Sequence, residues 1–170
     1  MFDISKFRTV NNFPKPGVKF FDITTVLNDT ESFQELFQAL LEKAQALKPD
    51  VITALEARGY IFAPALALAL NLPFVPLRKK GKLPYKTFSE QYDLEYGNET
   101  IEVHQDAMKP NQRILICDDI LATGGTAAAA AKLMKHFNPE KIDFLFLIEL
   151  SFLNGREKIA AYDTESLIIV

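Results

Sequence analysis

Two adjacent aspartates and a turn rich in glycine and threonine follow a hydrophobic run at residues 113–117. The aspartates are Asp118 and Asp119, and the turn comprises Ala122, Thr123, Gly124, Gly125 and Thr126. Glycine lets backbone N–H groups approach an anion, and the start of a helix attracts one. Carboxylates repel a phosphate but accept hydrogen bonds from sugar hydroxyls. The motif therefore predicts a ligand that carries both hydroxyls and a phosphate, such as a ribose 5-phosphate.

This motif differs from the common nucleotide-binding loops. No Gly-Lys-Ser/Thr follows it, as in a Walker loop, and it lacks the G-x-G-x-x-G of dinucleotide folds. The alternative interpretation is an acidic strand end followed by an ordinary glycine turn. That alternative leaves the combination of hydrophobic run, paired aspartates and T-G-G-T to coincidence, so we favour a phosphate cradle.

Alternating hydrophobic patterns predict the elements that position the motif. Strands are expected at residues 50–55, 73–78, 113–117 and 141–150, and helices at 32–47, 59–71 and 126–137. Ser32 and Glu35 have the spacing of a capping box, and Pro64 fits the first turn of its helix. Strands separated by helices imply parallel pairing through right-handed crossovers. Ligands of such sheets lie beyond the carboxyl ends of the strands, which is where the motif falls.

Composition narrows the class of protein. The chain has 170 residues, 48% of them hydrophobic, which suits one domain with a core. A formal net charge of -3 gives no global reason to expect nucleic acid or a membrane as a partner. The single cysteine, Cys117, excludes an internal disulfide and should act as a small hydrophobe in its strand. Residues 1–10 lack a signal-peptide pattern, and no apolar run approaches the roughly 20 residues of a membrane span, so we expect a cytoplasmic protein.

Residues 114–126 resemble the phosphoribosyl pyrophosphate signature of the type I phosphoribosyltransferases. The remainder resembles the adenine-specific members of that family, in the same order along the chain. The similar segments are residues 13–24, 56–67, 78–84, 92–97 and 154–162. The resemblance implies an α/β fold of a single domain over residues 1–170, with a parallel β-sheet flanked by helices. It also implies an N-terminal hood over the base at 1–30 and a mobile flap at 79–97.

The resemblance implies a reaction as well: adenine and phosphoribosyl pyrophosphate give AMP and pyrophosphate. Magnesium is the implied cofactor, held mainly by the substrate rather than by direct protein ligands, and a homodimer is the implied assembly. Two alternatives stay open. One is a transferase for hypoxanthine, guanine or xanthine, and the other is a non-catalytic regulator that senses phosphoribosyl pyrophosphate.

Ribosyl transfer passes through an oxocarbenium-like centre, so the enzyme must neutralise the leaving pyrophosphate. Four basic residues are candidates for that role: Arg58, Arg78, Lys79 and Lys82. The alternative for residues 78–82 is a solvated loop or a basic address signal. The resemblance places Arg58 among the catalytic residues, in a pyrophosphate loop, and implies a cis peptide between Glu56 and Ala57.

The segment 79–96 is too polar for a core strand and too aromatic for a plain linker. A mobile flap that closes over the reaction and excludes water is the favoured interpretation. The resemblance assigns Glu95, near the end of this segment, to proton transfer with the purine. The alternative is an exposed carboxylate on a hairpin.

Residues 16–24 are expected to supply the base pocket, with Val18 and Phe20 against adenine. The ring of Phe20 offers a flat face on which a purine can stack. Phe21 stands where the family usually has arginine, and we expect it to pack in the core instead.

Overall fold

The structure is a computed structural model that describes residues 2–12, 19–94 and 97–170. Within these ranges seven strands form one mixed sheet in the order β5-β6-β4-β3-β7-β8-β9. Its strands are β3 (Val51–Leu55), β4 (Phe74–Lys79), β5 (Thr87–Leu94), β6 (Gly97–His104), β7 (Arg113–Leu121), β8 (Lys141–Glu149) and β9 (Asp163–Ile169). The pairs β3/β4, β3/β7, β7/β8 and β8/β9 are parallel. The α/β prediction is confirmed, but β6 pairs antiparallel with both β4 and β5, so the sheet is not parallel throughout.

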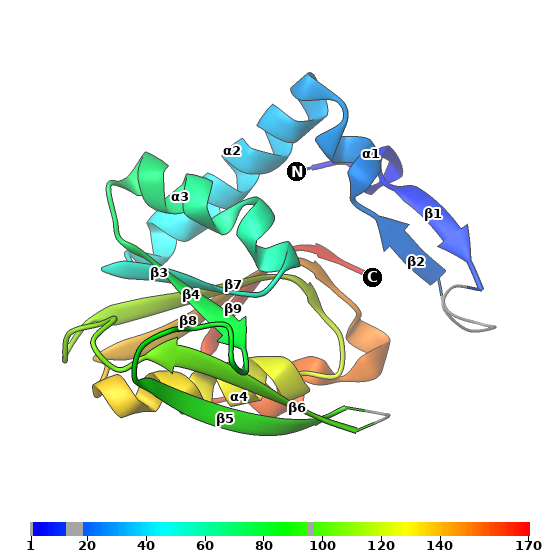
Figure 1. Ribbon diagram of the computed structural model, residues 1–170. Coiled ribbons are helices and arrows are strands. Elements are labelled where there is room, and N and C mark those ends of the chain that lie inside the picture. The colour runs from blue at the N-terminus through cyan, green and yellow to red at the C-terminus, as the bar shows by residue number, and fades with distance from the viewer. Residues whose placement is uncertain (1, 13–18, 95–96) are drawn as a thin grey trace.

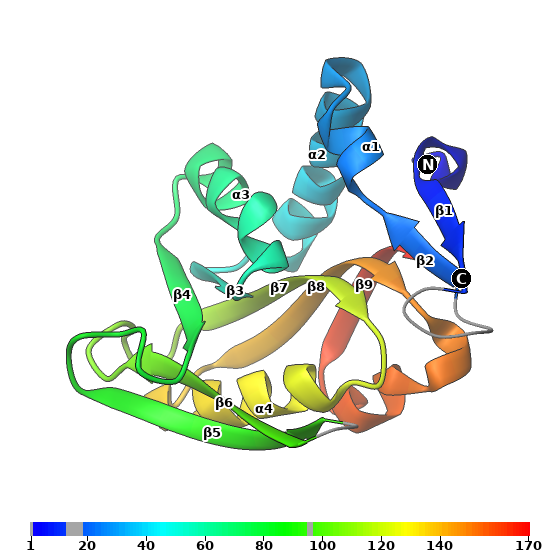
Figure 2. The ribbon, with the colours of Figure 1, turned by 45° about the vertical axis from the view of Figure 1, so that its right-hand side comes forward.

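Helices cover both faces of this sheet (Figures 1 and 2). The helices α2 (Thr30–Leu47) and α3 (Ala63–Leu70) lie on one face, and α4 (Gly125–Met134) lies on the other. Strand β7 shows how the sheet serves both layers, because Leu115 and Cys117 join the core under α2 and α3 while Ile114 and Ile116 join the core over α4. Cys117 is fully buried, as predicted for a small hydrophobe, and burial raises the pKa of its thiol.

Helix α2 begins earlier than its sequence pattern suggested. Asp29 caps it by accepting a hydrogen bond from the Ser32 N–H at 2.9 Å. The predicted capping box of Ser32 and Glu35 is therefore wrong, because both residues lie inside the helix and the Glu35 carboxylate pairs with Lys6. Burial of its apolar stripe, which includes Leu36 and Leu40, contributes about 1.5–3 kcal/mol per leucine.

The expected helix at 59–71 is divided in two. A 3-10 turn, η2 (Arg58–Ile61), precedes α3, and Pro64 lies in the first turn of α3 as predicted. The division keeps Arg58 and Gly59 out of regular α-helix and directly beyond the end of β3. This places the predicted pyrophosphate loop at the carboxyl edge of the parallel strands.

Three parts of the fold were not anticipated as strands. They are the hairpin β5–β6, the edge strand β9, and a separate two-stranded sheet of β1 (Arg8–Asn11) and β2 (Lys19–Asp22). The strands of the hairpin take in about half of the predicted flap and pack on the α4 side, where the ring of Phe88 stacks on His136 with centroids 4.4 Å apart. Flap movement stays a prediction.

The segment predicted to form an N-terminal hood has a defined place in the fold. Its strands β1 and β2, the 3-10 turn η1 (Ile4–Lys6) and the short helix α1 (Thr24–Leu27) lie beside α2 and near the C-terminus (Figures 1 and 2). Phe21 is buried there at 5% exposure, which confirms the predicted core packing. Across the described ranges, no helix is long and apolar enough to cross a membrane.

Candidate active site at the carboxyl edge of the parallel strands

The phosphate cradle, residues 122–126, forms the turn between β7 and α4. Gly124 has φ +74°, a left-handed conformation that glycine adopts without strain, and α4 begins at Gly125. The cradle and Asp118 line a small hollow of about 70 Å³. The start of α4, Thr123 and Thr126, which can supply N–H and hydroxyl donors to an anion, thus line one concave space.

The two aspartates lie within β7 rather than after it. The strand continues through Leu121 because Ile120 and Leu121 keep pairing with β8. Asp118 Oδ1 accepts a hydrogen bond from the Asp119 N–H at 2.9 Å, and the side chain of Asp119 is only 4% exposed. The carboxylates therefore hold fixed positions at the edge of the sheet, beside the cradle.

Burial dominates the electrostatics of this pair. It raises the pKa of Asp118 well above its ordinary value, and the neighbouring Asp119 carboxylate raises it further. Burial also raises the pKa of Asp119, opposed by the positive charge of Arg58. Arg58 Nε lies 2.9 Å from Asp119 Oδ2, an ion pair without hydrogen-bond alignment. Ligand hydroxyls that donate to these oxygens would stabilise their charged forms.

The pyrophosphate loop lies directly against the aspartates. The peptide between Glu56 and Ala57 is cis, as the resemblance implied. A Cβ added to Gly59 would lie 2.9 Å from the Cys117 carbonyl oxygen and 3.4 Å from Asp118 Oδ1. Glycine at this position therefore allows the loop to approach β7 closely, which brings the guanidinium of Arg58, half exposed, over the acidic pair.

Two of the other predicted cations, Arg78 and Lys79, already have carboxylate partners. Arg78 donates from Nε and Nη2 to Glu56 at 3.2 and 3.3 Å, and the Lys79 N–H donates to the same carboxylate at 3.1 Å. Lys79 Nζ donates to Glu99 at 2.9 Å, and Lys82 is exposed on the same loop. These hydrogen bonds, from Arg78 first and then from the Lys79 backbone, lower the pKa of Glu56.

Glu56 and Glu99 were not anticipated by the sequence reasoning. Glu56 directly precedes the Ala-Arg-Gly of the pyrophosphate loop, which was a usable signal, whereas Glu99 becomes a neighbour of Lys79 only through the β4/β6 pairing. We call Arg58, Arg78, Lys79 and Lys82 the basic cluster. Its outer members, Arg78 and Lys79, form their ion pairs with Glu56 and Glu99 rather than with the acidic pair.

Two predicted site residues, Glu95 and Val18, lie outside the described residues, so their roles stay predictions. Phe20 lies on β2 and is partly buried. Its predicted stacking on adenine is untested.

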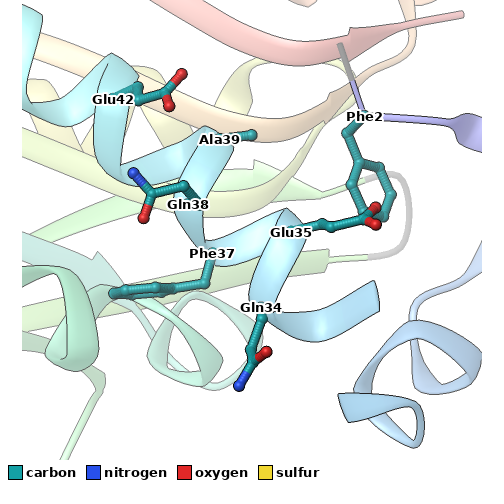
Figure 3. A pocket seen from close by; sticks show the side chains of 7 residues that line it. All are labelled: Phe2, Gln34, Glu35, Phe37, Gln38, Ala39 and Glu42. Atoms are coloured by element: carbon teal, nitrogen blue, oxygen red, sulfur yellow. The ribbon is translucent and has the colours of Figure 1, made fainter. Parts of the chain in front are cut away.

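Larger hollows occur away from this edge. One of about 700 Å³ lies between α2 and Phe2 (Figure 3), and another of about 520 Å³ lies beside Lys141 and Tyr162. None of the predicted site residues lines either hollow. The Glu35 carboxylate on the wall of the first is already paired with Lys6. Volume alone therefore does not locate the chemistry, whereas the cradle gathers backbone donors, hydroxyls and carboxylates.

The site suits magnesium that arrives with a substrate. Across the described ranges there is no group of three or more His, Cys, Asp or Glu side chains that could hold a metal ion. Magnesium is commonly bound through one or two carboxylates together with substrate phosphates. The carboxylates of Asp118 and Asp119, beside the cradle, fit that limited contribution.

Comparison with known proteins agrees with this geometry. Residues 23–169 match the family model of the phosphoribosyl transferase domain. The adenine phosphoribosyltransferase of Desulfitobacterium hafniense is 48% identical over 167 residues, which cover 98% of this chain and 96% of that protein. The chain belongs to the adenine phosphoribosyltransferase family.

Solved structures extend the likeness to the fold. The adenine phosphoribosyltransferase of Thermoanaerobacter pseudethanolicus is 46% identical with a TM-score of 0.91, over 98% of this chain and 96% of that one. The Saccharomyces cerevisiae enzyme is 38% identical with a TM-score of 0.89, over 96% and 94%. That yeast structure is a complex with D-2,5-dideoxy-2,5-imino-altritol 1,6-bisphosphate and adenine.

Proposed function

We propose that the protein transfers the 5-phosphoribosyl group of phosphoribosyl pyrophosphate to adenine and releases AMP and pyrophosphate. The observation that carries the site assignment is the phosphate cradle joined to the Asp118–Asp119 pair at one edge of the sheet. A ribose phosphate has the two chemical groups that these two features recognise, and high similarity to adenine phosphoribosyltransferases supports the reaction.

The sugar phosphate occupies the cradle. Backbone N–H groups at the start of α4 and the hydroxyls of Thr123 and Thr126 donate to the 5-phosphate. Asp118 and Asp119 accept hydrogen bonds from the ribose hydroxyls, which are weak donors that a carboxylate can orient. Fixing both ends of the sugar positions C1 for attack by the purine nitrogen.

The basic cluster receives the leaving pyrophosphate. The C1–O bond breaks as the base–C1 bond forms, and the departing oxygen carries the electron pair into the pyrophosphate. Arg58 is the nearest cation to the acidic pair, and Arg78 and Lys79 contribute after exchanging their carboxylate partners. Magnesium, held mainly by substrate oxygens beside Asp118 and Asp119, would add charge neutralisation on the leaving group.

Glu95 handles the purine proton, and the flap excludes water. A carboxylate within reach of the base accepts the proton that the purine loses on forming its new bond. Closure of the segment 79–97 prevents water from capturing the oxocarbenium-like centre. Phe20 and Val18 pack on the adenine ring under the hood.

Steady-state assays with adenine, hypoxanthine, guanine and xanthine test the proposed base. Turnover with adenine alone is the expected result. Preference for a 6-oxopurine would establish the first alternative, and binding of phosphoribosyl pyrophosphate without any turnover would establish the regulator. The homodimer and the cytoplasmic location also stay predictions, and light scattering tests the homodimer.

A structure of the AMP complex tests the site. We expect the phosphate against residues 122–126 and the ribose hydroxyls near Asp118 and Asp119. A phosphate bound beside the basic cluster instead would overturn this assignment.

A further inference from the structure

The backbone of Gly155 is packed against the phosphate cradle. A Cβ added to Gly124 would lie 2.2 Å from the Gly155 carbonyl oxygen, and a Cβ added to Gly155 would lie 2.1 Å from the Ala122 carbonyl oxygen. Two glycines that lack space for a methyl group thus face each other across two separate turns. In Figures 1 and 2 the segment after β8 lies beside the turn between β7 and α4. The shape of the cradle therefore depends on where Gly155 is held.

The residue after Gly155 anchors that contact. Arg156 belongs to the short 3-10 turn η5 (Gly155–Ile159) and binds the Glu149 carboxylate through both Nε, at 2.8 Å, and Nη2. Its Nη1 donates to the Thr164 carbonyl oxygen on β9 at 2.8 Å. One guanidinium thus joins the end of β8 to β9 immediately beside the cradle contact.

The Glu149 carboxylate, which accepts from this arginine, is itself buried and held in place. Its side chain is 7% exposed, and the Ser166 hydroxyl donates to Oε2 at 2.6 Å. Glu149 also pairs in register with Leu121, the last residue of β7 before the cradle. The anchor of Arg156 is therefore attached to the same strand pair that carries the cradle.

We propose that Arg156 and Glu149 are positioning residues that hold Gly155 against Ala122 and Gly124 and so fix the phosphate cradle. The inference rests on the proposed binding of the sugar phosphate at residues 122–126. Neither residue contacts substrate in this proposal. They act through the backbone of Gly155, and they serve the sugar-phosphate half of the reaction rather than the base half.

The planar guanidinium is required for this role. Its donors form a fork that satisfies both carboxylate oxygens and a carbonyl at once, whereas the single ammonium of lysine cannot reproduce that arrangement. Arg156→Lys should therefore recover part of the function that Arg156→Gln loses.

The test measures AMP binding by calorimetry, the KM for adenine, and Tm for Arg156→Gln, Arg156→Lys and a control. Arg113→Gln is the matched control, because the Arg113 guanidinium likewise joins separate elements by hydrogen bonds, here to the carbonyl oxygens of Leu47 and Lys48, but at the amino-terminal end of β7. We expect Arg156→Gln to weaken AMP binding by about tenfold, the loss expected for one charge-assisted contact. The AMP affinity of Arg156→Lys should lie between those of wild type and Arg156→Gln. The KM for adenine should stay within about threefold of wild type in both variants.

Comparison of the variants separates positioning from general destabilisation. Arg113→Gln should lower Tm without weakening AMP binding. If Arg113→Gln weakens AMP binding as much as Arg156→Gln does, the positioning role is overturned. It is also overturned if Arg156→Gln leaves AMP binding unchanged. A Glu149→Gln, Arg156→Gln double variant should lose little more than either single variant, because both substitutions break one unit. Additive losses would contradict the proposed pairing.

Gly125→Val tests the proposed phosphate site directly, because Gly125 is part of the cradle and begins α4, and it therefore separates failure of the site from failure of the positioning role. Loss of AMP affinity in Gly125→Val but not in Arg156→Gln would retain the cradle and remove the positioning role. No loss in Gly125→Val would instead overturn the proposed site of the phosphate.

Discussion

The two halves of the site, the phosphate cradle and the basic cluster, are formed by different parts of the chain: backbone in the first and side chains in the second. The phosphate cradle is backbone packed on backbone, with Gly124 and Gly155 too close to accept a methyl group. The basic cluster consists of long side chains at the surface, where the side chains of Arg58 and Lys79 are 50% and 54% exposed. Its outer members are held by the carboxylates of Glu56 and Glu99, which a ligand can replace.

This difference suits the ligands that we propose for the two halves, which are the sugar phosphate for the cradle and pyrophosphate for the basic cluster. The sugar phosphate stays bound throughout the reaction, so a rigid cradle formed without side-chain rearrangement serves it well. Pyrophosphate must leave, and cations that return to waiting carboxylates can release it. Backbone sites should therefore fail abruptly on substitution, whereas side-chain sites should lose function in steps.

The largest effect is expected from Gly124→Ala. The new Cβ would meet the Gly155 carbonyl oxygen at 2.2 Å, in a residue with φ +74°. The left-handed conformation costs alanine about 1–2 kcal/mol, and overpacking typically adds about 1–3 kcal/mol. The turn must shift, so we expect AMP affinity, measured by calorimetry, to fall by about 100-fold.

Gly81→Ala is the matched control for this variant. Gly81 has φ +77°, but a Cβ there would have nothing within 4 Å, so the substitution adds the backbone strain without the clash. Its AMP affinity should stay within about threefold of wild type, well below a loss of 1.4 kcal/mol. Similar losses in the two variants would show that tight packing around the cradle is not what matters.

Glu95→Gln should reduce turnover and not binding. Glutamine keeps the size of the side chain but removes its basic site, so kcat for adenine should fall by about 10²-fold, the usual scale for a general acid–base group. The affinity for phosphoribosyl pyrophosphate should change little. Glu90→Gln, on β5 in the same hairpin, is the control and should retain its kcat. If kcat of Glu95→Gln stays within about threefold, backbone or water must handle the proton instead.

Arg58→Ala tests the stepwise behaviour of the basic cluster. A charge-assisted hydrogen bond contributes about 1.5–3 kcal/mol, so kcat/KM for phosphoribosyl pyrophosphate should fall by about tenfold or more. AMP carries no pyrophosphate, and its affinity should fall less. Equal losses for the two ligands would indicate that Arg58 acts mainly by neutralising Asp119, its partner at 2.9 Å.

The sequence predicted the parts of the fold that are buried on both faces. All five residues of β3 are buried, and β8 is almost entirely so, which makes them continuous apolar runs. The edge strands β5 and β9 have one open face and mixed polarity, so their composition resembles that of a loop or flap. For this reason the sequence favoured a flap at residues 79–96 and left a hairpin only as the alternative.

The same division holds for the site. The cradle was predictable because its backbone conformation requires particular residue types at adjacent positions, as at Gly124. The pairing of Arg156 with Glu149 was not, because it depends on which strands become neighbours in the folded sheet. Likewise, the partner of Lys79 follows from the β4/β6 register rather than from any local pattern.

The smallest effect concerns the stability of the acidic pair. Burial raises the pKa of Asp118 well above its usual value of 3.8, so the folded protein binds a proton that the unfolded chain releases. That contribution to stability is present below the unfolded pKa and is lost as pH rises through the folded pKa. At pH 7, which is above the unfolded pKa, the raised pKa of Asp118 therefore lowers the stability of the fold relative to acidic pH.

Asp118→Asn should accordingly raise Tm at pH 7 while weakening AMP binding. A rise of about 2–4 °C is expected, the shift that about 1 kcal/mol causes in a chain of this length, and it should shrink toward pH 4. Asn keeps the Oδ1 acceptor for the Asp119 N–H, so the local hydrogen bond survives. Asp163→Asn is the control of opposite sign, because the hydrogen bond from Lys141 lowers the pKa of Asp163. Removing the Asp163 carboxylate should therefore lower Tm at pH 7. A Tm of Asp118→Asn that stays below that of wild type from pH 4 to pH 8 would show that the Asp118 carboxylate stabilises the fold. Its burial would then have no cost in stability.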